Sequence, residues 1–219
     1  MDIQGVIFDF DYTFGDATEG IVLSIRYAMG KMGYPLPDVL SIKKTVGLSL
    51  ADTFSALTKN SDRDKADSFS SYFKEMADRE MVKNTIVYPG AAQVARMLRE
   101  NGIKTGIVSN KFRYRIEQIL SRFDLQNDID RIIGAEDVTC QKPDPEGLLK
   151  MVQQLQTDKS KTLYVGDSLV DAETAERADI SFIGVLTGTT TREDFAMYKH
   201  TAIVREIGDL QHELQELFE

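Results

Sequence analysis

Two aspartates, one residue apart, end a short apolar run near the start of the chain. The run Val6-Ile7-Phe8 leads directly into Asp9-Phe10-Asp11, and Tyr12-Thr13 follow. Buried strands exclude unpaired charge because removing a carboxylate from water is costly. The two carboxylates therefore predict that something near this strand end favours negative charge.

Polar groups also follow two later apolar runs. Ser109-Asn110-Lys111 come after one run, and Gly166-Asp167-Ser168, with Asp171 beyond, come after the other. A loop with two prolines and a lysine, Gln141-Lys142-Pro143-Asp144-Pro145, lies between them. In open parallel sheets the ligand crevice lies beyond the carboxyl ends of the strands. We therefore expect all these groups to meet at one edge of a sheet.

The residue types suit a site that binds a metal ion and a phosphate group. Asp9, Asp11 and Asp167 offer hard oxygen ligands, which Mg²⁺ prefers. Two unit charges about 4 Å apart interact by about 4 kcal/mol at an effective dielectric constant of about 20, so three carboxylates facing a phosphate need compensation. Mg²⁺ and Lys142 are expected to supply it. The Ser109 hydroxyl and the Asn110 backbone amide are expected to hold phosphate oxygens as neutral donors.

The elements that position these groups alternate between strand and helix. We expect strands at residues 3–9, 104–108, 129–133, 162–165, 181–185 and 202–204. We expect helices at residues 115–122, 145–154, 172–177 and 207–218, and between Pro89 and Gly102. Alternation with short loops predicts an α/β fold, a Rossmann-like parallel sheet with helices on both faces.

A segment without strand-like runs interrupts this alternation early. Val22, Ile25 and Met29 have helical spacing, and residues 48–57 and 64–81 also show amphipathic patterns. We therefore predict an all-helical domain at residues 16–84. It is inserted into an α/β core domain formed by residues 1–15 and 85–219.

Composition excludes several classes of protein. The chain has 219 residues, a net charge of −9 and 42% hydrophobic residues, which is typical of a soluble globular protein. Nucleic-acid binding is not expected, because it needs clustered lysine and arginine. The single cysteine, Cys140, excludes an intrachain disulfide, and we expect it to be buried or half-buried. Without a signal peptide pattern or an apolar run of membrane-spanning length, we predict a cytoplasmic location and no membrane partner.

Four motifs, DFDYT, IVSN, QKPDP and GDSLVD, together resemble the ordered motifs of haloacid-dehalogenase-superfamily phosphatases. The resemblance is to the branch with a helical, C1-type cap inserted soon after the first motif. Within that branch the sequence is similar to phosphoglycolate phosphatases. It covers essentially the whole chain. One such motif would be weak because short patterns recur by chance, whereas four in the right order are specific.

The resemblance implies roles for individual residues. Asp9 is then the nucleophile that forms an aspartyl-phosphate, and Asp11 is first the general acid for the leaving group and then the base that activates water. Mg²⁺ is bound by Asp9, by the backbone carbonyl of Asp11 and by Asp167. Asp171 lies behind these ligands or reaches the metal through water. Lys142 orients Asp9.

The resemblance also implies that Ser109, Asn110 and Lys142 bind the phosphoryl group. Two residues depart from the family pattern, since this branch usually has glycine in place of Tyr12 and leucine in place of Phe14. Tyr12 is expected to need a loop that tolerates a bulky side chain, directed away from the metal and toward the cap. It is also a candidate for contact with the substrate.

Residues of the inserted segment are candidates for substrate selection. The stretch SIKKTVGLSL matches the place where cap residues of related phosphatases face the site, which selects Lys43, Lys44, Thr45 and Gly47. Arg26 has a similar status. A solvated helix end is an equally favoured interpretation, because exposed lysines are common.

These observations predict a Mg²⁺-dependent phosphomonoesterase that acts on a small phosphorylated metabolite. A β-phosphoglucomutase-like isomerase and an inorganic pyrophosphatase are alternatives within the same fold. A dehalogenase is disfavoured, because that reaction needs neither Mg²⁺ nor an acid at Asp11. A catalytically weak binding or regulatory protein, its site blocked by Tyr12, is the alternative from another class. The sequence predicts neither the physiological substrate nor the oligomeric state.

Overall fold

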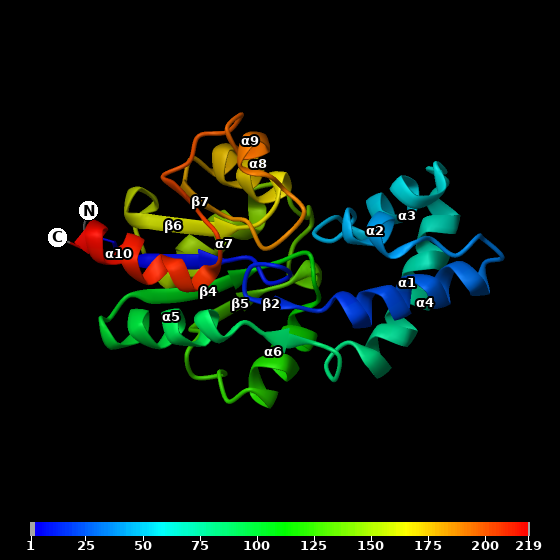
Figure 1. Ribbon diagram of the computed structural model, residues 1–219, viewed down its shortest axis with the longest axis horizontal. Helices are drawn as coiled ribbons and strands as arrows, with labels where there is room; N and C mark the ends of the chain where they lie inside the picture. Colours follow the sequence, from blue (N-terminus) through cyan, green and yellow to red (C-terminus); the bar gives the residue numbers. More distant parts are fainter. Residues whose placement is uncertain (1–2, 219) are drawn as a thin grey trace. The chain divides into compact units, whose positions relative to one another are not determined.

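The computed structural model describes residues 3–218 and contains two compact units (Figure 1). One unit contains the described residues up to Asp16 together with those from Val87 onward, and the other contains Ala17–Ile86. The chain leaves the first unit after β2 (Gly15–Asp16) and returns through β3 (Ile86–Val87). These two short strands form a separate two-stranded sheet.

The first unit is built on a six-stranded sheet with the strand order β5-β4-β1-β6-β7-β8. The strands are β1 (Gly5–Phe8), β4 (Lys104–Val108), β5 (Arg131–Ile133), β6 (Thr162–Gly166), β7 (Ser181–Val185) and β8 (Ala202–Val204). Every pairing between neighbouring strands is parallel. The predicted α/β class with a parallel sheet is confirmed.

Helices cover this sheet (Figure 1). They are α5 (Pro89–Glu100), α6 (Arg113–Arg122), α7 (Glu146–Leu155), α8 (Leu169–Ala178), α9 (Arg192–Phe195) and α10 (Leu210–Phe218), with 3-10 turns at Ala135–Asp137, Lys159–Lys161 and Ile207–Asp209. Side chains of α7 and α8 share one core with Ile7, Tyr164 and Phe182 of the sheet. Helices α5 and α10 pack against each other. All four residues of β1 are buried, which is typical of a strand covered on both faces.

The strand register brings the ends of the three central strands to within one residue of one another. Phe8, the last residue of β1, lies opposite Ile107 of β4 and Val165 of β6. The N–H of Asp9 continues this ladder and donates to the carbonyl of Val165 at 2.8 Å. The first residues after β1, β4 and β6, which are Asp9, Ser109 and Asp167, therefore reach the carboxyl edge of the sheet within one residue of the same level.

The second unit consists of helices. They are α1 (Thr18–Lys31), α2 (Val39–Lys43), α3 (Leu50–Thr58) and α4 (Arg63–Glu80). Phe54 and Phe69 are fully buried in its core, with ring centroids 5.5 Å apart. Helices α2, α3 and α4 follow Asp38, Ser49 and Asp62, whose side chains accept hydrogen bonds from the first turn. Each such cap contributes about 1 kcal/mol to helix stability.

Most predicted elements lie close to their observed positions, and the differences have local causes. The strand expected at 129–133 begins at Arg131, because the carboxylate of Asp130 accepts a hydrogen bond from the N–H of Thr105 at 2.8 Å. Helices α2 and α9 were not predicted, since five and four residues are too few to show a helical period. None of the helices that the structure describes combines the length and the apolar character that a bilayer crossing requires.

The prediction that Cys140 is buried or half-buried is wrong, because its side chain is exposed. The backbone N–H groups of Thr139 and Cys140 donate to the carboxylate of Glu146, at 3.0 and 2.9 Å. Backbone hydrogen bonds, and not burial of the thiol, therefore fix this part of the loop.

Candidate active site

A tight turn after β1 holds both aspartates of the first motif inside the protein. The N–H groups of Phe14 and Gly15 both donate to the carbonyl of Phe10, at 2.8 and 3.0 Å. Asp9 is 2% exposed and Asp11 is 8% exposed. Two carboxylates at this depth need compensating charge, as the sequence indicated.

Tyr12 has a backbone conformation that favours glycine. Its φ of 61° lies in the left-handed region, which costs a residue with a side chain about 1–2 kcal/mol. This accounts for the glycine that the family pattern has at this position. The N–H of Tyr12 donates to the carbonyl of Gly15 at 2.7 Å, and its carbonyl accepts a hydrogen bond from Thr187 Oγ1. The turn accommodates the tyrosine, and the direction of its ring toward the cap stays a prediction.

Lys142 lies at the centre of a buried network. Its Nζ is 2.6 Å from Asp171 Oδ1 and 2.8 Å from Asp9 Oδ1. The same ammonium donates to Tyr164 Oη at 3.0 Å. Burial lowers the pKa of Lys142, but Asp171 and Asp9 outweigh burial and hold the pKa well above its usual value. The ammonium therefore stays charged and links the first motif to the fourth.

The side chain of Asn110 positions the loop that carries Lys142. Asn110 Oδ1 accepts a hydrogen bond from the N–H of Lys142 at 3.0 Å, and Asn110 Nδ2 donates to its carbonyl at 3.2 Å. Ser109, the preceding residue, is buried, and its Oγ accepts from the N–H of Lys111 at 3.3 Å. The end of β4 thus fixes the lysine loop, an arrangement that the sequence did not predict.

Asp171 is fully buried, and both of its oxygens are occupied by protein donors. Oδ1 accepts from Lys142 and, at 2.8 Å, from Tyr164 Oη. Oδ2 accepts from both the N–H and the hydroxyl of Ser168, the N-cap of α8. Asp171 therefore completes the capping box of α8 and also holds the ammonium of Lys142.

Asp9, Asp167 and Asp171 form a cluster of buried carboxylates whose oxygens lie within 4.8 Å of one another. Burial raises the pKa of Asp9 to about 6, with Lys142 lowering it and Asp171 and Asp11 raising it. Burial, reinforced by Asp171 and Asp9, likewise raises the pKa of Asp167 well above its usual range. The ammonium of Lys142 lies against two of these carboxylates, 2.6 Å from Asp171 Oδ1 and 2.8 Å from Asp9 Oδ1. Three crowded, buried carboxylates are a donor set that fits a hard divalent cation such as Mg²⁺.

The raised pKa of Asp9 predicts that the metal-free protein loses stability as pH rises. A carboxyl with a pKa of about 6, against 3.8 ordinarily, binds its proton more tightly in the folded state. Its contribution to the free energy of unfolding is therefore full below pH 3.8 and is lost as pH rises through about 6. Urea unfolding in EDTA, at about pH 5 and about pH 8, measures the decrease. Asp9→Asn should show a smaller decrease, and an equal one would contradict the prediction.

Comparisons with known proteins bear on this geometry. A family profile described as haloacid dehalogenase-like hydrolase matches residues 6–185. The chain belongs to this hydrolase family. A solved structure described as a haloacid dehalogenase-like hydrolase from Bacteroides fragilis has a TM-score of 0.92 and 40% identity, covering 95% of this chain and 99% of that one.

Curated relatives of this hydrolase are named for phosphate chemistry. The chain is 32% identical to a phosphoglycolate phosphatase of Cereibacter sphaeroides over 184 residues, covering 82% of this chain and 84% of that protein. It is 29% identical to the proposed pyrophosphatase PpaX of Caldanaerobacter subterraneus over 186 residues, covering 84% and 82%. The predicted family and the predicted class of enzyme, a hydrolase of the phosphatase type, are confirmed.

The loop after β7 of the hydrolase packs directly against Asp167. A Cβ atom added at Gly188 would lie 1.9 Å from Asp167 Oδ2. Thr187, the residue before it, binds the carbonyl of Tyr12. Only glycine fits at position 188 without displacing the carboxylate, so this loop shapes the carboxylate cluster.

Gly188→Ala is therefore expected to weaken binding of divalent metal. Changes to groups that support metal ligands cost about 10–100-fold in affinity, and we expect a Kd for Mg²⁺ at least about tenfold higher. Isothermal titration calorimetry on the purified protein measures this. Gly30→Ala is the control, because its added Cβ would meet nothing closer than Leu36 at 3.9 Å. Unchanged Mg²⁺ affinity in Gly188→Ala would contradict the prediction.

The cap candidates have contacts of their own within the second unit. Arg26 Nε donates to the carbonyl of Pro37 at 3.2 Å, and buried Thr45 donates to the carbonyl of Ile42 at 2.8 Å. Both contacts support the helical fold of the segment. Of the remaining three candidates, Lys44 is exposed, whereas Lys43 and Gly47 are half-buried. Their predicted part in substrate selection stays a prediction.

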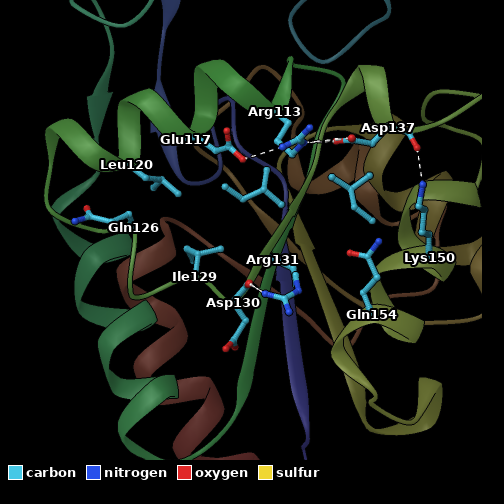
Figure 2. A pocket seen from close by; sticks show the side chains of 12 residues that line it. Arg113, Glu117, Leu120, Gln126, Ile129, Asp130, Arg131, Asp137, Lys150 and Gln154 are labelled. Atoms are coloured by element: carbon cyan, nitrogen blue, oxygen red, sulfur yellow. Dashed lines mark hydrogen bonds and ion pairs between the residues drawn. The ribbon is translucent and has the colours of Figure 1, made fainter.

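A separate groove lies between α6, β5 and α7 (Figure 2). Arg113 pairs there with Asp137 at 2.9 Å and with Glu117 at 3.0 Å. Lys150 donates to the carbonyl of Asp137 at 2.7 Å. None of the predicted site residues lines this groove, so it is distinct from the strand-end cluster.

Proposed function

We propose that this hydrolase cleaves the phosphate monoester of a small metabolite, with Mg²⁺, through an aspartyl-phosphate on Asp9. The observation that carries the proposal is the buried cluster at the strand ends. There Lys142 Nζ lies 2.8 Å from Asp9 Oδ1, and Asp9 is within reach of Asp167 and Asp171. A carboxylate held by a buried ammonium in this way is oriented for attack on a phosphoryl group.

The proposed reaction has two steps. A carboxylate oxygen of Asp9 forms a bond to phosphorus while the bond to the leaving-group oxygen breaks, and Asp11 gives its proton to that oxygen. Asp11 then takes a proton from water, which attacks the same phosphorus and releases Asp9 and inorganic phosphate. Lys142 orients Asp9 and, with the Ser109 hydroxyl, faces the phosphoryl oxygens. Positioning and charge stabilisation dominate catalysis in such transfers.

Mg²⁺ would be held by the carboxylates of Asp9 and Asp167 and by the backbone carbonyl of Asp11, with Asp171 behind them. When bound, the ion would offset the charge that carboxylates and phosphate bring together. Asp171 keeps its hydrogen bonds to Lys142, Tyr164 and Ser168 in this arrangement.

The substrate proposed first is phosphoglycolate or a similar small ester, including sugar phosphates. Its support is the 32% identity to a phosphoglycolate phosphatase over most of both chains. Inorganic pyrophosphate is the second candidate, favoured by the 29% identity to PpaX. The mutase and the regulatory protein remain alternatives that the same assay addresses.

The test is release of inorganic phosphate from p-nitrophenyl phosphate, 2-phosphoglycolate, sugar phosphates and pyrophosphate. We expect ester hydrolysis that EDTA abolishes and added Mg²⁺ restores. Hydrolysis that is indifferent to EDTA would refute the metal requirement, and a faster reaction with pyrophosphate would favour the second candidate. Isomerised sugar phosphate, seen by phosphorus NMR, would identify a mutase. Ligand-dependent thermal stabilisation without turnover would identify a binding protein.

A further inference from the structure

A second buried lysine pairs with the other aspartate of the first motif. Lys111 Nζ lies 3.0 Å from Asp11 Oδ2, and the two side chains are 5% and 10% exposed. The same ammonium lies 5.8 Å from the centre of the Phe10 ring. Both charges are largely removed from water. Removal of either one would leave the other buried without a counter-charge, which is strongly destabilising.

The two oxygens of the Asp11 carboxylate have different surroundings. Lys111 binds Oδ2, whereas Oδ1 is buried and has no hydrogen-bond partner among the described residues. Buried polar atoms without a partner are rare in folded proteins. One anchored oxygen and one open oxygen suit a carboxyl group that exchanges a proton with a substrate at a fixed position.

The backbone of Lys111 is held on both sides. Its N–H donates to Ser109 Oγ at 3.3 Å, and its carbonyl accepts from the N–H of Ala135 at 3.1 Å. These bonds attach the residue to the end of β4 and to the turn after β5. The ammonium therefore reaches Asp11 from a backbone whose position the sheet determines.

We propose that Lys111 is a positioning residue that binds Asp11 Oδ2 and so keeps Oδ1 directed at the oxygen of the leaving group. The proposal rests on the proposed function, in which Asp11 protonates that oxygen. Lys111 should then matter most when the leaving group needs a proton. Ethyl phosphate needs one, because an alkoxide is a poor leaving group, whereas p-nitrophenyl phosphate releases a stable phenolate.

The test compares kcat/KM for these two esters in the wild-type enzyme and in Lys111→Met, with Mg²⁺ present. This ratio covers only the steps up to the aspartyl-phosphate, so its later hydrolysis does not contribute. General acid catalysis supplies about 10²–10⁴-fold. We expect a fall of about 10²-fold for ethyl phosphate and a fall at least about tenfold smaller for p-nitrophenyl phosphate. Lys111→Arg, which keeps the charge, should recover part of the activity toward ethyl phosphate.

Lys150→Met is the matched control. Lys150 is a half-buried lysine of the same unit, and it binds the carbonyl of Asp137 in the separate groove (Figure 2). This variant should keep the wild-type kcat/KM for both esters. If Lys111→Met does not fold, the double variant Lys111→Met/Asp11→Asn replaces it, because that pair leaves no unpaired charge. It should match Asp11→Asn alone for both esters.

Equal falls for both esters in Lys111→Met, with weaker inhibition by vanadate, would show that Lys111 binds phosphate directly and would overturn the proposal. A double variant less active than Asp11→Asn alone would also overturn it. A wild-type protein that hydrolyses neither ester would overturn the proposed function and this proposal together. The two failures are therefore distinguishable.

Discussion

Asp9→Asn is expected to lower kcat by about 10⁴-fold or more on every phosphate ester, a loss of the size that removal of a covalent nucleophile causes. Asparagine keeps the shape of the side chain, but its amide oxygen is a poor nucleophile. The position is 2% exposed, so solvent has little access to replace the missing carboxylate. The variant should also accumulate no acid-stable phosphoprotein.

Phosphate release and acid quench with radiolabelled substrate measure the two effects together. Asp179→Asn is a suitable control, because this carboxylate is exposed and ends α8 at a φ of 55°, which asparagine tolerates. Turnover that survives in Asp9→Asn would assign the attack on phosphorus to water. Full phosphoprotein formation in that variant would assign the nucleophile to another side chain.

The strand-end residues were predictable because their positions depend on local pattern and sheet topology. Asp9 and Asp167 each follow an apolar run, and parallel strands bring such positions to one edge. Lys142 lies in a loop between strands, and the two prolines that follow it indicated a rigid loop that could hold a functional lysine. The network of Lys142 was less predictable, since Tyr164 in the middle of β6 reads as an ordinary core aromatic. The part of the Tyr164 hydroxyl in the network is visible only in the structure, where it lies 3.0 Å from the Lys142 ammonium.

Lys111 and Gly188 escaped prediction for related reasons. A lysine directly after a strand is usually solvated, although its place next to Ser109 and Asn110 was an available signal. Gly188 matters through the space that it leaves for Asp167, and no pattern along the chain reports such a distance. Short helices and the exposure of Cys140 were missed because individual backbone hydrogen bonds, and not periodicity, determine them.

Lys142→Met is expected to reduce both stability and turnover. The change leaves Asp171 and Asp9 buried beside each other without their shared cation, and breaking a buried ion pair costs about 3–5 kcal/mol. The free energy of unfolding in EDTA near neutral pH should fall by about that amount. In the folded variant, kcat/KM should fall by about 10²–10³-fold, as when one charge-stabilising donor leaves a site. Urea unfolding and hydrolysis of p-nitrophenyl phosphate with Mg²⁺ measure the two losses.

The double variant Lys142→Met/Asp9→Asn separates charge balance from packing. The partner of Asp9 Oδ1 is the ammonium of Lys142, which the first change already removes, so asparagine then removes a charge at little other cost. If uncompensated charge destabilises Lys142→Met, the double variant should recover part of the lost unfolding free energy and no turnover. If the loss comes from the missing lysine stem, which also packs apolar surface, the second change should recover nothing. Recovery of stability without turnover would mean that Lys142 balances the charge of the carboxylates in the fold. It would also mean that the reaction needs the Lys142 ammonium for a role other than this charge balance.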